Sequence, residues 1–208
     1  WTMQVLQLKG QVLLQLGRHE DAKTVYRDAL ERRPQLVWAQ LGLAKAHKAA
    51  GQFEEAKHLA YEIINSQDGE KNVAAYDVVA EALEAQGESE AALWALRDAA
   101  TVIPSTRRQR LVGESAYRNG DLDTALECFQ KVTKATKSSV IAQAQDTLWL
   151  AQALVDKGDP AAALAALDEG GQRQRNDPAF DSVATAIRAQ AHVKAGNADA
   201  AEKLLQRA

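Results

Sequence analysis

The sequence predicts an all-α fold made of about six stacked helical hairpins, and three regular features support this. A glycine recurs at intervals of 33 to 38 residues, each time just before an alanine-centred segment. An alanine stands five residues after every one of these glycines, and Gly or Ala stands seven residues before each. A period near 34 residues is typical of helix–turn–helix units that bury their apolar faces by stacking on their neighbours. The six glycines are Gly17, Gly51, Gly87, Gly120, Gly158 and Gly196.

Each recurring position has a physical reason. Glycine adopts the positive φ that ends the first helix of a hairpin without a steric penalty. The polar residues after the turn, such as Asp121, Asp159 and Asn197, are expected to cap the second helix. The small residues are expected where the two helix axes come closest. A mostly large residue nine after the glycine is expected to fill the gap to the next hairpin, at Tyr26, Ala60, Leu96, Phe129, Leu167 and Leu205.

In chain order, we expect one domain over residues 1–208, with hairpins at about 3–36, 37–70, 73–105, 106–139, 144–177 and 182–208. Pro34 and Pro104 end the first and third hairpins, because proline does not continue a helix. The longer spacings predict extended turns or helices near Gln67–Lys71, Lys134–Ser139 and Gly170–Asp177. Gly170 predicts an early end to the fifth hairpin. Because the sequence opens inside a helical pattern at Trp1, we expect a fragment of a longer protein.

Over essentially its whole length, this pattern resembles the tetratricopeptide repeat family. The resemblance implies a right-handed superhelical solenoid that acts as a protein-binding scaffold and carries no catalytic site. It also implies that the first helix of each hairpin lines a concave groove.

Shorter segments resemble the helical region of bacterial response regulators, in which these repeats follow an N-terminal receiver domain. They are 107–113, 117–121, 38–45 and 75–77. This resemblance implies that the chain is the partner-binding output region of a two-component phosphorelay protein. The alternative is a free-standing adaptor in envelope or pilus assembly. Both would bind a protein or peptide.

In the family's geometry, the residues thirteen, ten, six and three before each glycine point into the groove. The proposed partner-binding residues at these positions in the second to fourth repeats are Trp38, Leu41, Lys45, Lys48, Asp77, Glu81, Glu84, Arg107, Arg110, Glu114 and Tyr117. The fifth repeat offers Gln145, Leu148, Gln152 and Val155. The chaperone-binding branch of the family grips a C-terminal carboxylate with Lys, Arg and Asn on first helices. No Asn stands at the groove positions, so we predict no carboxylate clamp. The alternative role of the charged residues is ion pairing between neighbouring helices.

Composition limits the remaining chemistry. The net charge of −3 gives no basic field for nucleic acid, and Arg107–Arg110 has no interleaved aromatic residue. No apolar run approaches the roughly 20 residues that cross a bilayer. A single cysteine, Cys128, fits a reducing, cytoplasmic location. We therefore expect no nucleic-acid or membrane partner, no cofactor, no metal site and no enzyme activity. The four histidines are scattered along the sequence, and the four tryptophans are expected to be packing residues. Exposed end repeats could pair with each other, so a homodimer is also compatible with the sequence.

Overall fold

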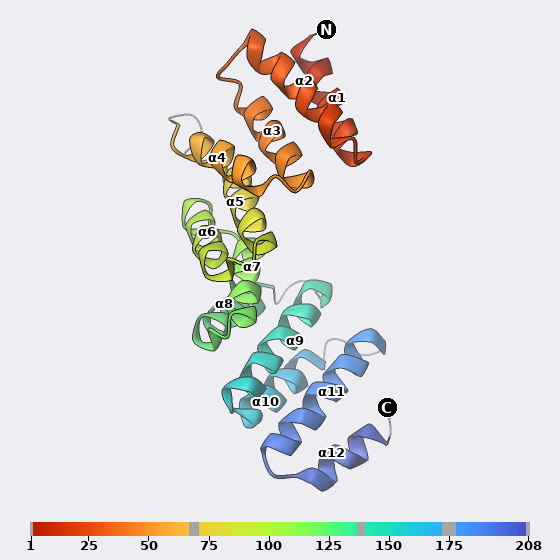
Figure 1. Cartoon of the computed structure of the whole chain (residues 1–208). Helices are drawn as coiled ribbons and strands as arrows, with labels where there is room; N and C mark the ends of the chain where they lie inside the picture. The colour runs from red at the N-terminus through yellow and green to blue at the C-terminus, as the bar shows by residue number, and fades with distance from the viewer. Residues whose placement is uncertain (1, 67–70, 137–139, 172–177, 207–208) are drawn as a thin grey trace. The chain divides into compact units, whose positions relative to one another are not determined.

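The computed structural model describes residues 2–66, 71–136, 140–171 and 178–206, and over these ranges the chain forms twelve helices and no strand (Figure 1). This confirms the predicted all-α class. Consecutive helices pair into six hairpins. The helices are α1 (Met3–Gln15), α2 (His19–Arg32), α3 (Val37–Ala49), α4 (Phe53–Ile64), α5 (Val73–Ala85), α6 (Ser89–Val102), α7 (Thr106–Arg118), α8 (Leu122–Ala135), α9 (Val140–Lys157), α10 (Pro160–Gly171), α11 (Pro178–Lys194) and α12 (Ala198–Leu205).

The turns follow the expected chemistry except in part of their caps, because Gln52, Glu88 and Asn197 make no side-chain capping hydrogen bond. All six repeat glycines have positive φ, between 71° and 91°. The side chain of Asp121 accepts a hydrogen bond from the backbone N–H of Thr124 at 3.1 Å. That of Asp159 accepts one from Ala162 at 3.0 Å. The side chain of Asn197 makes no capping hydrogen bond, so its predicted capping role is wrong.

The helices gather in two compact units, Trp1–Pro104 with α1 to α6 and Ser105–Ala208 with α7 to α12. Each unit contains three hairpins. One continuous solenoid over the whole chain stays a prediction.

In the first unit, the core is built around Tyr26 of α2, which is almost fully buried. An added Cβ at Gly10 on α1 would lie 2.5 Å from the Tyr26 ring, and one at Gly42 on α3 would overlap the same ring. Neither position has room for a side chain, because real Cβ contacts are not that short. Two glycines on neighbouring first helices therefore make the space that one tyrosine fills.

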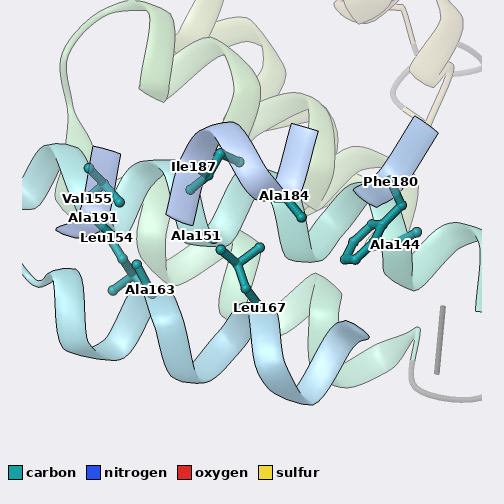
Figure 2. Close-up of a cluster of buried hydrophobic side chains, with 10 residues drawn as sticks. All are labelled: Ala144, Ala151, Leu154, Val155, Ala163, Leu167, Phe180, Ala184, Ile187 and Ala191. Carbon is teal, nitrogen blue, oxygen red and sulfur yellow. The ribbon is translucent and has the colours of Figure 1, made fainter. Parts of the chain in front are cut away.

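In the second unit, α9, α10 and α11 meet in an apolar cluster (Figure 2). Leu167 of α10 and Phe180 of α11 are buried there among alanines from all three helices. Phe129 of α8 is fully buried, and a Cβ at Gly113 on α7 would lie 2.8 Å from its ring. The pairing of Gly113 with Phe129 repeats that of Gly10 with Tyr26, at the same two positions of the repeat.

The first helices of the last two hairpins are longer than the others. α9 has 18 residues and α11 has 17, against 13 in each of α1, α3, α5 and α7. Both begin four residues before the expected hairpin starts at 144 and 182. Longer helices therefore account for part of the 38-residue spacing. The expected insertions near 67–71, 134–139 and 170–177 lie largely outside the described residues.

α10 continues through Gly170 and ends at Gly171, with 12 residues as in α4 and 14 in α2, α6 and α8. A Cβ at Gly170 would lie 2.7 Å from the Thr147 side chain of α9. The glycine thus allows a close approach of the two helices of this hairpin.

Candidate functional site

In the first unit, the predicted groove residues lie on α3 and α5 with half-buried or exposed side chains. The Lys48 ammonium of α3 forms an ion pair with Glu81 of α5. The Trp38 ring packs edge-on against Tyr26, with ring centroids 6.4 Å apart, and is half-buried. Trp38 therefore contributes to the core as well as to the surface. The others of the set on these helices are Leu41, Lys45, Asp77 and Glu84.

In the second unit, α7 carries Arg107, Arg110, Glu114 and Tyr117. Arg110 donates to both carboxylate oxygens of Asp146 on α9, at 2.6 and 2.9 Å. Asp146 is fully buried and also accepts a hydrogen bond from the Thr136 hydroxyl at 2.9 Å. Arg110 therefore forms an ion pair between neighbouring helices, which was the alternative to partner binding. Its partner Asp146 is buried in the core and is not solvated.

Tyr117 sits at the edge of an aromatic group. Its ring lies edge-on to Trp149 at 5.5 Å, and Trp149 stacks on Phe129 at 5.7 Å. The Tyr117 hydroxyl donates to Asp156. Burial, followed by this bond to a carboxylate, raises the pKa of Tyr117 to about 12, because both disfavour the phenolate. Tyr117 therefore stays a neutral hydrogen-bonding group at physiological pH.

Beside this aromatic group lies a cleft of about 280 Å³ between α9 and α11. Its floor is apolar, from Leu148, Trp149, Val183 and Ile187, and two amide side chains complete the lining, Gln145 and Gln152. Val183 is exposed, and Gln152 donates to Gln190 of α11 at 3.1 Å. An apolar floor beside amide groups suits an aliphatic or aromatic side chain whose backbone continues across the surface.

The sequence placed three of the six lining residues, Gln145, Leu148 and Gln152, at groove positions of the fifth repeat. It missed Val183 because the register was not continued into the sixth repeat, and it missed Ile187 because this residue stands nine before Gly196, which is not a groove position. Counting thirteen residues back from Gly196 reaches Val183, so the signal was present. Trp149 was expected as packing, and its stacking on Phe129 agrees, although it also lines the cleft.

Two other expectations are wrong. Val155, predicted to face the groove, is almost fully buried. Trp94, predicted as packing, is 63% exposed, and the Arg97 guanidinium lies over its ring at 5.3 Å. A helix in this fold has several faces, and counting along it does not tell which are covered. Trp1 lies outside the described residues.

Two other reactive side chains, Cys128 and His47, have packing environments. Cys128 is buried, and His47 is buried with its Nδ1 2.8 Å from the Gln52 amide oxygen. Burial lowers the pKa of His47, since desolvation disfavours the imidazolium. Within the described ranges, the His, Cys, Asp and Glu side chains form no group of three that could hold a metal ion. None of the helices described there has the combined length and apolarity that spanning a bilayer requires.

Comparison with known families places the repeats. Models of the tetratricopeptide repeat match residues 13–76, 112–179 and 182–207. No curated protein matches the chain.

Solved structures share the fold. The crystal structure of MamA is 19% identical, with a TM-score of 0.64, and the match covers 79% of this chain and 94% of that one. YrrB, described as a TPR protein with an unusual peptide-binding site, is 13% identical, with a TM-score of 0.68 over 87% and 89%. A thermophilic TPR protein of Thermus thermophilus is 21% identical, with a TM-score of 0.55 over 89% and 98%. With matching family models, helical hairpins and positive-φ glycines at each turn, the chain belongs to the tetratricopeptide repeat family.

Proposed function

We propose that the α9–α11 cleft binds an extended peptide segment of a partner protein and takes one of its apolar side chains. The fold itself is that of a protein–protein interaction scaffold, which implies a protein or peptide ligand. The observation that carries the proposal is the apolar floor of Leu148, Trp149, Val183 and Ile187 on first helices of adjacent hairpins.

The size of the cleft favours a side chain over a whole small molecule. Clefts that enclose drug-sized ligands measure about 300–1,000 Å³. At about 280 Å³ and open to solvent, this one lies at the lower edge of that range. An aliphatic or aromatic side chain would bury its surface there, while the rest of the peptide stays outside.

The rim favours a peptide backbone. Gln145 is exposed, and an amide side chain both donates and accepts, which matches the N–H and C=O groups of an extended chain. None of the six residues that line the cleft carries a positive charge. This supports the prediction that no carboxylate clamp operates, because a terminal carboxylate would find no cation in the lining.

The groove residues on α3, α5 and α7 stay proposed as further contacts for the same class of ligand. Lys48, Glu81 and Arg110 are less suited to that role, because each already has an ion-pair partner. The two-component output role and the envelope-adaptor alternative also stay predictions. Sequencing the gene upstream of Trp1 tests them, since a receiver domain supports the first and a signal peptide or lipid anchor supports the second.

The cleft is tested with a library of random extended peptides displayed on phage and panned against the 208-residue chain. We expect enrichment of sequences with a Leu, Ile, Phe or Trp anchor, and loss of their binding in Val183→Asp. Ala161→Asp is the matched control, because Ala161 is exposed on α10 and does not line the cleft. Binding that survives Val183→Asp would place the peptide elsewhere.

A further inference from the structure

A second cleft, the α10–α12 cleft, measures about 400 Å³ and shares no residue with the α9–α11 cleft. Its lining combines basic, acidic and apolar side chains from three helices, among them Leu164 and Asp168 of α10, Arg188 and His192 of α11, and Lys203 and Leu204 of α12. Arg188 and His192 stand four residues apart, so they lie on the same side of α11. Basic side chains of two helices therefore lie beside an apolar surface.

The arginine departs from the repeat pattern. Arg188 stands eight residues before its turn glycine, where α3, α5, α7 and α9 have the apolar residues Leu43, Val79, Val112 and Leu150. The first three of these are buried, and Leu150 packs against the apolar cluster of its unit. Because packing between hairpins uses apolar side chains at this position, it does not account for an arginine there.

The histidine also differs in its surroundings from its counterpart in the first unit. His47 of α3 stands at the position of His192, and its Nδ1 lies 2.8 Å from Gln52 Oε1. The same oxygen accepts a hydrogen bond at 2.8 Å from Lys23, which is almost fully buried. At the position of Lys23, α10 has Leu164. The lysine that completes the polar network at His47 is therefore missing beside His192.

Arg188 is oriented by the protein and still has donors to offer. Its Nη2 donates to the backbone oxygen of Leu167 at 3.1 Å and to Asp168 Oδ1 at 3.2 Å. The guanidinium has further N–H donors on Nε and Nη1. The Asp168 side chain is 72% exposed, so water screens its attraction for the arginine. A guanidinium held in this way suits the two oxygens of a carboxylate.

We propose that the α10–α12 cleft binds an acidic side chain, Asp or Glu, from a segment of a partner protein. Two cations, Arg188 and Lys203, face one anion, Asp168, so the lining has a formal charge of +1 with neutral histidine. This charge matches a single carboxylate, whereas a phosphorylated side chain would bring about two negative charges towards Asp168. Leu164 and Leu204 offer apolar surface to the CH₂ groups of the acidic residue.

The site lies outside the predicted groove. Arg188 and His192 stand eight and four residues before their glycine, whereas the groove positions are thirteen, ten, six and three before it. The site is therefore not the carboxylate clamp of the family, and its ligand is a side chain rather than a chain terminus. It shares with the proposed function only the class of ligand, a protein or peptide, so either proposal can fail without the other.

The test is fluorescence anisotropy of the 208-residue chain with a peptide of alternating Glu and Gly, amidated at its C-terminus and labelled with a neutral dye. We expect this peptide to bind and the matching Gln and Gly peptide not to bind. The chain has a net charge of −3, so general attraction does not favour the acidic peptide. Absence of binding, or equal binding of both peptides, would overturn the proposal.

Two variants with the same change of charge locate the site. Arg188→Gln should raise the dissociation constant of the Glu peptide about tenfold, the loss expected for hydrogen bonds to a charged group. Lys194→Gln should leave it unchanged, because Lys194 is exposed on the same helix and does not line the cleft. Equal effects of the two changes would mean that net charge and not the cleft governs binding.

A third variant should strengthen binding, which a loss of folding does not imitate. Asp168→Asn removes the competing carboxylate and keeps an oxygen that accepts from Arg188. We expect the dissociation constant to fall about two- to threefold, as for an exposed ion pair. Unchanged or weaker binding would overturn the assignment of Arg188 as the partner of the ligand.

Two further measurements distinguish the other possible sites and ligands. Val183→Asp should leave the affinity for the Glu peptide unchanged, and a loss of binding would place this peptide in the α9–α11 cleft. Free glutamate at the same carboxylate concentration should not displace the peptide. Displacement would assign the α10–α12 cleft to a small acid and overturn the proposal of a protein ligand.

Discussion

The two units join successive hairpins by different means. In the first unit, Lys23 and Lys57 extend from second helices to polar partners in the next hairpin, Gln52 and Glu88. In the second unit the same repeat position holds Leu126 and Leu164, which pack against the apolar cluster. Polar links occur at other positions in that unit, and one of them is the buried pair of Arg110 and Asp146.

This difference shows that the hairpin spacing does not require one particular bond. Small residues at the closest helix approaches fix the geometry, and the link beside them is exchangeable. The two kinds of link differ in how much stability is lost when the cation is removed. A carboxylate at the surface is solvated when it loses its partner, whereas a fully buried carboxylate is not.

The largest effect is expected for Arg110→Ala, which leaves the buried Asp146 without its cation. Breaking such a pair typically costs about 3–5 kcal/mol of unfolding free energy. Urea unfolding followed by circular dichroism measures it. Lys57→Ala is the counterpart in the first unit, with an expected loss of about 0–1 kcal/mol, since Glu54 and Glu88 are exposed. Equal losses would contradict the distinction between the two kinds of link.

The next largest effect is expected where a glycine allows a helix to pack closely against an aromatic ring. Gly113→Ala places a Cβ 2.8 Å from the Phe129 ring and 3.0 Å from Cys128 Cβ, and overpacking of this kind costs about 1–3 kcal/mol. Phe129→Leu in the same chain should recover much of this loss, because Ala with Leu is the combination at Ala80 and Leu96 and at Ala151 and Leu167. A double-mutant cycle in urea gives the coupling. Strictly additive losses would mean that the glycine is not matched to the ring.

A smaller effect is expected when a lysine that joins two hairpins of the first unit is replaced by leucine, the residue at the same repeat position in the second unit. Lys57→Leu should change the unfolding free energy by no more than about 1 kcal/mol in either direction, because an apolar stem already fills the site and the acidic partners are exposed. Thermal unfolding measures it, with Ala161→Leu on the exposed side of α10 as the control. A loss of several kcal/mol would show that the lysine charge is needed.

The last prediction concerns a single proton. The pKa of Tyr117 is about 12 in the folded chain, against 10.0 for an ordinary tyrosine. The raised pKa means that the contribution of Tyr117 to stability is complete below pH 10 and is lost as the pH rises towards 12. Phenolate absorbance, compared with that of Tyr117→Phe, isolates its titration. Asp156→Asn should lower the pKa while burial keeps it above the ordinary value, and titration near pH 10 in the unaltered chain would refute the burial argument.

The local parts of the fold followed from the sequence because they depend on short-range chemistry. Glycine at each turn permits positive φ, and prolines stop α2 and α6 within two residues. The alanine five residues after each glycine is buried in every hairpin. The pattern was less informative where one residue serves two neighbours. Gly42 is the clearest case, since its small size accommodates Tyr26 of the preceding hairpin.

The candidate site was only half visible for the same reason. Leu148 and Gln152 followed from counting along α9, but the other wall of the cleft comes from α11, in another repeat. The burial of Asp146 could not be predicted from its neighbours in the sequence. It depends on Arg110, which pairs with it from 36 residues away.

The sequence by itself determined the all-α class, the repeat family, the turn positions and the residues at which paired helices touch. These features depend on side-chain size and backbone freedom within one repeat of about 34 residues, and the periodicity of the sequence reveals both. Only the tertiary structure decided which charges are buried, which tryptophan is exposed, and which apolar faces remain uncovered. Those outcomes depend on contacts between hairpins, where burial is set by the neighbour and not by the residue itself.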